Sequence, residues 1–117
     1  MTIYALVADL FFSARIRETA KQLGVPLEVF RDPAALIDRV AAAPPRLVIV
    51  DMNLKTGDAA AAVRALKAQP TAVQVVGFLH DAHDELIRAA RAAGCDKVLS
   101  RGGLTAKMPE LMAPRDA

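Results

Sequence analysis

The sequence predicts an α/β fold, a doubly wound parallel sheet of five strands with helices on both faces. Short apolar runs alternate along the chain with longer segments whose apolar residues recur at helical spacing. The runs expected at the centre of the sheet do not alternate polar and apolar residues, as in strands that are buried on both sides of a parallel sheet. One of them, LVIV at 47–50, ends directly on the carboxylate of Asp51.

The first part of the chain contains two predicted strand and helix pairs. Residues 3–8 (IYALVA) form the first strand, and the helix after it ends at Gly24. Residues 26–30 (PLEVF) alternate polar and apolar, which predicts a half-exposed edge strand. Asp32 and Pro33 then supply an N-cap and a first-turn proline for the second helix. The inward-facing residues are Phe12, Ile16, Ala20 and Leu23 in the first helix, and Leu36, Ile37 and Val40 in the second.

The remaining strands and helices follow in the same alternation. Residues 47–50 form the third strand, Asp58 caps the third helix, and residues 73–79 (VQVVGFL) form the fourth strand. The fourth helix ends at Gly94, and residues 97–99 (KVL) form the fifth strand before a short, proline-interrupted last helix. The inward-facing residues are Val63 and Leu66 in the third helix, and Leu86, Ile87 and Ala90 in the fourth.

Composition narrows the class of protein. The 117 residues are 54% hydrophobic and 24% charged, which predicts one domain over residues 1–117 with a sizeable core and no output domain. No apolar run approaches the ~20 residues of a membrane span, so we expect a cytoplasmic protein without a membrane partner. The net charge of +2 comes from dispersed basic residues, which argues against a nucleic-acid partner. The single cysteine, Cys95, is expected to be a small buried apolar residue.

Two aspartates stand at the ends of predicted strands. Asp9 closes the first strand and Asp51 closes the third, so both are expected at the crevice where ligands bind in open parallel sheets. Two neighbouring carboxylates repel each other, and a divalent cation held by oxygen ligands relieves that repulsion. The alternatives are that Asp9 only caps the first helix and that Asp51 is a plain loop residue.

These residues resemble the receiver domains of two-component response regulators over nearly the whole chain. DMNLKTGDA at 51–59 resembles the phosphoacceptor segment of that family, and AAGCDKVLSR at 92–101 resembles its turn into the fifth strand. The resemblance implies a flavodoxin-like fold with strand order 2-1-3-4-5 and Asp51 as phosphoacceptor. It also implies a Mg²⁺ site made by Asp9, Asp51 and the main-chain carbonyl of Asn53, although Asn53 is also an ordinary turn residue.

The sequence departs from the family pattern at the metal site. Ala8 stands beside Asp9 where the family has a second carboxylate, which leaves an acidic site of two residues. We therefore expect weak Mg²⁺ binding, on the millimolar scale.

The residues that would respond to a phosphoryl group also depart from the pattern. Leu79 stands at the position of the family's hydroxyl residue, with His80 adjacent, and Val98 stands at that of its aromatic residue. Arg101, or alternatively Ser100, occupies the lysine position. Arginine keeps the positive charge but not the geometry of an ammonium, and a surface arginine with no site role is the alternative. The sequence therefore predicts an incomplete switch.

The stretch HDAHDE at 80–85 has an ordinary structural interpretation. Asp81 is expected to cap the fourth helix, Asp84 and Glu85 to lie in its first turn, and His80 and His83 to be half exposed. No further ligand lies at the spacing that a metal site needs. No catalytic arrangement of nucleophile and base is present either, so we expect no enzyme.

Two classes of function remain. The first is a stand-alone receiver-like signalling module that binds a histidine kinase, a downstream effector or a second copy of itself. It acts either through phosphorylation of Asp51 or, as the missing groups favour, by docking without phosphate. The alternative is a small flavodoxin-like domain that binds a ligand or cofactor at the crevice of Asp9 and Asp51. Against it, VADLFF at 7–12 places bulky side chains where a glycine-rich phosphate turn would lie.

Overall fold

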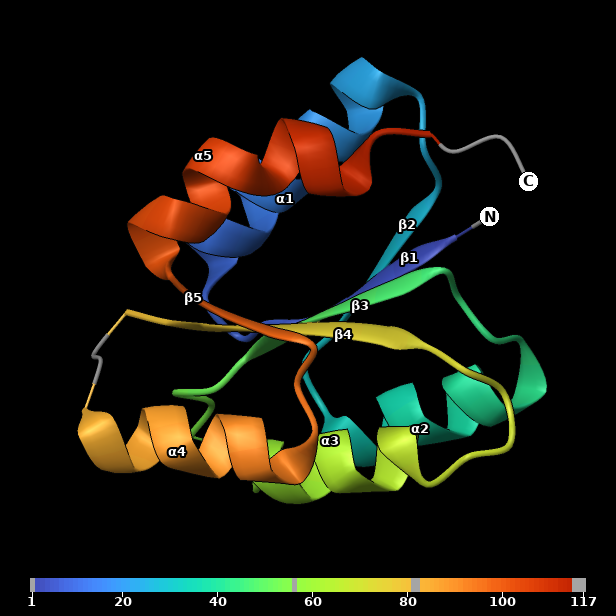
Figure 1. Cartoon of the computed structure of the whole chain (residues 1–117). Coiled ribbons are helices and arrows are strands. Elements are labelled where there is room, and N and C mark those ends of the chain that lie inside the picture. The colour runs from blue at the N-terminus through green and yellow to red at the C-terminus, as the bar shows by residue number, and fades with distance from the viewer. Residues whose placement is uncertain (1, 56, 81–82, 115–117) are drawn as a thin grey trace.

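The chain folds into a five-stranded parallel sheet between two layers of helices (Figure 1). This computed structural model describes residues 2–55, 57–80 and 83–114. The strand order is β2-β1-β3-β4-β5, which confirms the predicted fold class and order. The strands are β1 (Ile3–Leu6), β2 (Leu27–Phe30), β3 (Leu47–Asp51), β4 (Gln74–Leu79) and β5 (Lys97–Ser100). The helices are α1 (Leu10–Leu23), α2 (Pro33–Ala42), α3 (Ala59–Lys67), α4 (Asp84–Ala93) and α5 (Arg101–Met112).

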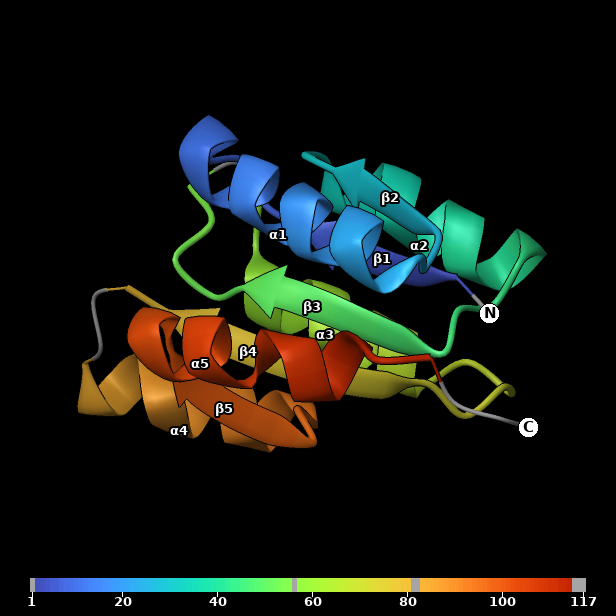
Figure 2. The same ribbon diagram turned by 90° about the horizontal axis from the view of Figure 1, so that it is seen from above.

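The helices divide between the two faces of the sheet. Helices α1 and α5 cover one face, and α2, α3 and α4 cover the other (Figures 1 and 2). Each face has its own apolar cluster: Val48 and Val50 of β3 belong to one, and Leu47 and Ile49 belong to the other. Successive side chains of a strand point to opposite faces, so a strand covered on both sides must be apolar throughout. In the described part of the chain, no helix has the length and apolar character needed to cross a bilayer.

Strand boundaries differ from the prediction by one or two residues. β1 ends at Leu6, although Val7 is still buried and its N–H donates to the carbonyl of Phe30 at 2.9 Å. β3 runs one residue further than predicted, so that Asp51 pairs with Phe78 of β4 inside the sheet. The plain loop interpretation of Asp51 is therefore wrong.

Helix ends follow the predicted signals with one exception. Asp32 and Asp58 accept hydrogen bonds at the N-termini of α2 and α3, and Gly24 and Gly94 end α1 and α4 in the left-handed conformation. At α4 the prediction is wrong, because the N-cap residue is His83 and the helix begins at Asp84. Asp81 itself lies outside the described residues.

The last helix is longer and more regular than predicted. α5 spans 12 residues and continues through Pro109, so the expected interruption is wrong. Proline removes one intrahelical hydrogen bond, but tertiary packing compensates for that loss. Met108 and Leu111 are buried against the sheet, and the Arg46 guanidinium donates to the carbonyls of Leu111, Met112 and Ala113 at 3.0–3.2 Å. Those bonds satisfy carbonyls that the helix end leaves without partners.

Gly77 of β4 leaves no room for a side chain. A Cβ atom there would lie 2.9 Å from Cys95 Sγ and 3.0 Å from Met52 Cγ. Cys95 was predicted to be buried but is half-buried, and this burial raises the pKa of its thiol to about 11. The thiol thus packs as a small apolar group over the backbone of β4.

Gly77→Ala is expected to lower the free energy of unfolding by about 1–3 kcal/mol, because overpacking displaces Cys95 and Met52. The measurement is urea unfolding at neutral pH. Gly102→Ala is the matched control, since a Cβ at Gly102 meets nothing within 4 Å. The control should leave stability unchanged or raise it slightly, because alanine favours the first turn of α5. Equal effects of the two substitutions would contradict the packing argument.

Candidate functional site

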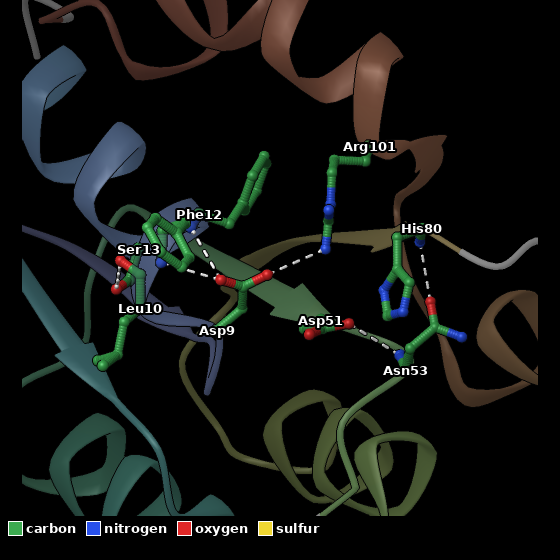
Figure 3. A network of polar contacts seen from close by, with 9 residues as sticks. Asp9, Leu10, Phe12, Ser13, Asp51, Asn53, His80 and Arg101 are labelled. Atoms are coloured by element: carbon green, nitrogen blue, oxygen red, sulfur yellow. Dashed lines mark hydrogen bonds and ion pairs between the residues drawn. The ribbon is translucent and has the colours of Figure 1, made fainter.

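A cavity of about 270 Å³ lies at the carboxyl edge of the sheet, among the predicted site residues. Parallel strands end at the same edge, and here the ends of β1, β3 and β4 meet the start of α5 (Figure 3). The cavity is lined by Ala8, Asp9, Asp51, Asn53, Leu54, Lys55, His80 and Arg101. The fold thus brings both predicted carboxylates into one site.

Asp51 is a buried carboxylate at the carboxyl edge of the sheet. It is the last residue of β3 and only 5% exposed. Its Oδ1 accepts a hydrogen bond from the N–H of Asn53 at 2.9 Å. Burial raises the pKa of Asp51, while that hydrogen bond and the charges of His80 and Arg101 oppose the rise. Burial of an ionised carboxylate lowers the free energy of unfolding, and such costs are common at functional sites.

Asn53 links two of the loops around the cavity. Its side-chain Oδ1 accepts a hydrogen bond from the N–H of His80 at 2.9 Å, which ties the loop after β3 to the end of β4. Sequence reasoning gave Asn53 only a main-chain role and missed this side-chain contact. No local signal could have revealed it, because the two residues are 27 positions apart.

Asp9 has two structural roles. The N–H groups of Phe11 and Phe12 donate to its Oδ1 at 2.9 and 3.2 Å, so Asp9 caps the first helix. Capping is not its only contact, so the alternative that Asp9 only caps the helix is wrong. Its other oxygen, Oδ2, accepts from Arg101 Nη2 at 3.2 Å and lies at the cavity. Both carboxylate oxygens are therefore engaged within the chain.

Arg101 is the positive group that faces the carboxylates. It is the first residue of α5, and its guanidinium carbon lies 5.2 Å from the centre of the Phe12 ring. Phe12 in turn packs on Phe78 of β4, with ring centres 4.8 Å apart. In the described part of the chain, Arg101 Nε is buried without a hydrogen-bond partner. The guanidinium is thus held in place, and its Nε–H is a buried donor without a partner.

The two candidates for the lysine position separate clearly in the structure. Ser100 uses its Oγ to cap α5, accepting from the N–H of Gly103 at 2.9 Å, and its side chain does not line the cavity. Arg101 does line the cavity and pairs with Asp9, so the surface-residue interpretation of Arg101 is wrong. The pair is partly exposed and contributes at most about 1 kcal/mol to stability. Its main effect is to hold the charges of Asp9 and Arg101 in position at the cavity.

The remaining predicted positions offer little polar chemistry. Leu79 is the last residue of β4, 2% exposed, with an aliphatic side chain. Val98 of β5 packs against the apolar cluster under α2, α3 and α4. His80 and His83 are exposed rather than half exposed, and only His80 lines the cavity.

The donor set as arranged does not fit a divalent cation. Among the described residues, no three His, Cys, Asp or Glu side chains are grouped so that they could hold a metal. Of the predicted ligands, Asp9 already binds the Arg101 guanidinium and the N-terminus of α1. Asp51 and the backbone of Asn53 alone leave most of an octahedral shell to water.

Comparison with known proteins identifies the fold but gives no sequence match. No protein-family model matches the chain, and no curated protein matches it. The signal receiver domain of an HD domain-containing protein from Pseudomonas fluorescens Pf-5 superposes with a TM-score of 0.82 at 19% identity, over 95% of this chain and 89% of that one. A CheY-like receiver domain from Methanospirillum hungatei JF-1 gives 0.79 at 16% identity, over 95% and 92% of the two chains.

A third similar structure contains a metal. The Mn²⁺-bound form of the response regulator Rcp1 superposes with a TM-score of 0.80 at 17% identity, over 94% of this chain and 90% of that one. These likenesses show that the chain has the fold of response-regulator receiver domains.

Asp51→Asn is expected to raise the free energy of unfolding at pH 7, by an amount on the order of 1 kcal/mol. The asparagine has no charge to desolvate and can still accept from the N–H of Asn53. Burial raises the pKa of Asp51 in the folded state, so burying the ionised carboxylate destabilises the fold. Below the unfolded-state pKa the group is neutral in both states and this penalty is absent. The penalty appears as pH rises through the folded-state pKa. The difference between the two proteins should therefore vanish in acid.

The measurement is urea unfolding of both proteins in metal-free buffer at neutral and acidic pH. Asp58→Asn is the matched control, because it changes an exposed carboxylate that caps α3 and asparagine caps equally well. A gap that is the same at both values of pH would contradict the burial argument.

Proposed function

We propose that this chain is a receiver-like signalling module that acts by binding another signalling protein, either a histidine kinase or a downstream effector. One observation carries the proposal: in a receiver fold, the end of β3 presents a buried carboxylate, Asp51, to a small cavity that also contains a fixed guanidinium. Proteins with the same fold can have different functions, so the function has to be inferred from the residues of the site.

Asp51 is the residue that we propose as phosphoacceptor. A phosphoryl group on its carboxylate would enter the cavity, where Lys55 and Arg101 supply positive charge. Arg101 supports the same placement, because it lines the cavity and a guanidinium binds phosphoryl oxygens through more than one N–H.

We favour docking that does not depend on phosphate. A ligand shifts a conformational equilibrium only through contacts that differ between the two states. Leu79 cannot donate a hydrogen bond to a phosphoryl oxygen, and Val98 has no ring to change position. A partner would then recognise the surface around the site as it stands.

Several further expectations belong to this proposal. Mg²⁺ enters it only as a weak ligand of Asp51 and its surroundings, on the millimolar scale at best. The partner is a protein, which includes a second copy of this chain, rather than nucleic acid or membrane, and the location is the cytoplasm. The alternative of a flavodoxin-like cofactor domain is less well supported, because 270 Å³ is below the usual ~300–1,000 Å³ of small-molecule sites.

Beryllofluoride with Mg²⁺ is expected to shift amide signals only next to Asp51 and to leave β4 and β5 nearly unchanged. The physical reason is the absence of a hydroxyl at Leu79 and of an aromatic ring at Val98. The measurement is a set of ¹H–¹⁵N correlation spectra, with mass spectrometry after acetyl phosphate treatment to detect a phosphoryl adduct.

Asp51→Asn provides the control, because it removes the acceptor while keeping the shape of the side chain. Broad shifts across residues 79–104 that disappear in Asp51→Asn would overturn phosphate-independent docking and indicate a working switch. A coloured purified protein would instead point to the cofactor alternative.

A further inference from the structure

Both oxygens of the Asp9 carboxylate have partners within the chain. Its Oδ1 holds the N-terminus of α1 through the N–H groups of Phe11 and Phe12, and its Oδ2 holds Arg101. A metal ion that took Asp9 as a ligand would have to displace either the helix cap or the ion pair. Ala8 offers no second carboxylate in compensation.

Arg101 is fixed in place by more than its ion pair. The guanidinium lies over the ring of Phe12, which is itself buried and packed on Phe78. Figure 3 shows the side chain extending from the start of α5 toward Asp9, on the side where Asp51 also lies. Because an arginine stays charged under all ordinary conditions, this position carries a permanent positive charge that repels a second cation.

We infer that Arg101 is the resident cation of this site, and that its pairing with Asp9 replaces the divalent metal that the fold would otherwise hold there. The inference concerns the same cavity as the proposed function but does not rest on it. It holds whether the chain docks to a partner, accepts a phosphoryl group or does neither. It also predicts that the obstacle to metal binding is one side chain, which can be removed.

The test compares the unchanged chain with Arg101→Gln and uses Mn²⁺ as a paramagnetic probe. Removal of the guanidinium frees Asp9 Oδ2 and lowers the local positive charge. We expect amide line broadening centred on Asp9, Asp51 and Asn53 to appear in Arg101→Gln at a roughly tenfold lower Mn²⁺ concentration than in the unchanged chain. Excess Mg²⁺ should reverse the broadening, because both ions prefer oxygen ligands.

Lys55→Gln is the matched control. Lys55 lines the same cavity, is exposed and carries the same charge, whereas Arg101 is the residue that pairs with Asp9. The control should bind Mn²⁺ with nearly the concentration dependence of the unchanged chain. A general effect of charge would move both variants equally and would overturn the inference.

A second measurement does not depend on the variants folding. The melting temperature of the unchanged chain should be the same with and without ~0.1 mM MgCl₂, since stabilisation by a ligand grows as RT ln(1 + [L]/Kd) and is negligible far below a millimolar dissociation constant. A rise of several degrees, micromolar Mn²⁺ binding by the unchanged chain, or no gain of binding in a folded Arg101→Gln would each overturn the inference.

Discussion

Strand β3 is buried on both faces and paired on both edges, and the arrangement of the whole chain follows from that constraint. Buried backbone groups must find partners inside the sheet, so β1 and β4 flank β3 along its length. Parallel neighbours require crossover helices, and these form the two covering layers. The same direction of all strands brings their carboxyl ends to one edge, which is where the candidate site lies.

At that edge, charge is placed by contacts that also hold the fold together. Asp9 caps the N-terminus of α1, and Ser100 caps that of α5. Asn53 links the loop after β3 to the end of β4. The pairing of Asp9 with Arg101 joins the beginnings of α1 and α5, which lie side by side on one face of the sheet. The site is therefore preorganised in a state where one carboxylate is neutralised by a guanidinium and the other, Asp51, remains buried beside it.

Most of the fold could be predicted because its signals are local. Apolar runs, helix caps such as Asp32 and Asp58, and the terminal glycines Gly24 and Gly94 act within a few residues of the chain. The misses occurred where distant contacts decide. α5 continues through Pro109, and Arg46, the residue before β3, binds the carbonyls at the end of that helix. At α4 the N-cap residue is His83, whose side chain makes no capping hydrogen bond, so no local capping signal marks the start of that helix.

The sequence by itself determined the class of fold, the edge of the sheet that carries the site, and the identity of its two aspartates. Each of these depends on the pattern and the ends of strands, which are set by residues adjacent in the sequence. Only the tertiary structure decided how those aspartates are used. Asp9 and Arg101 are 92 positions apart, and nothing local relates a residue after β1 to one that begins α5. Whether a carboxylate is free for a metal depends on the charges that the fold brings within a few ångströms of it, and that proximity is a property of the folded chain alone.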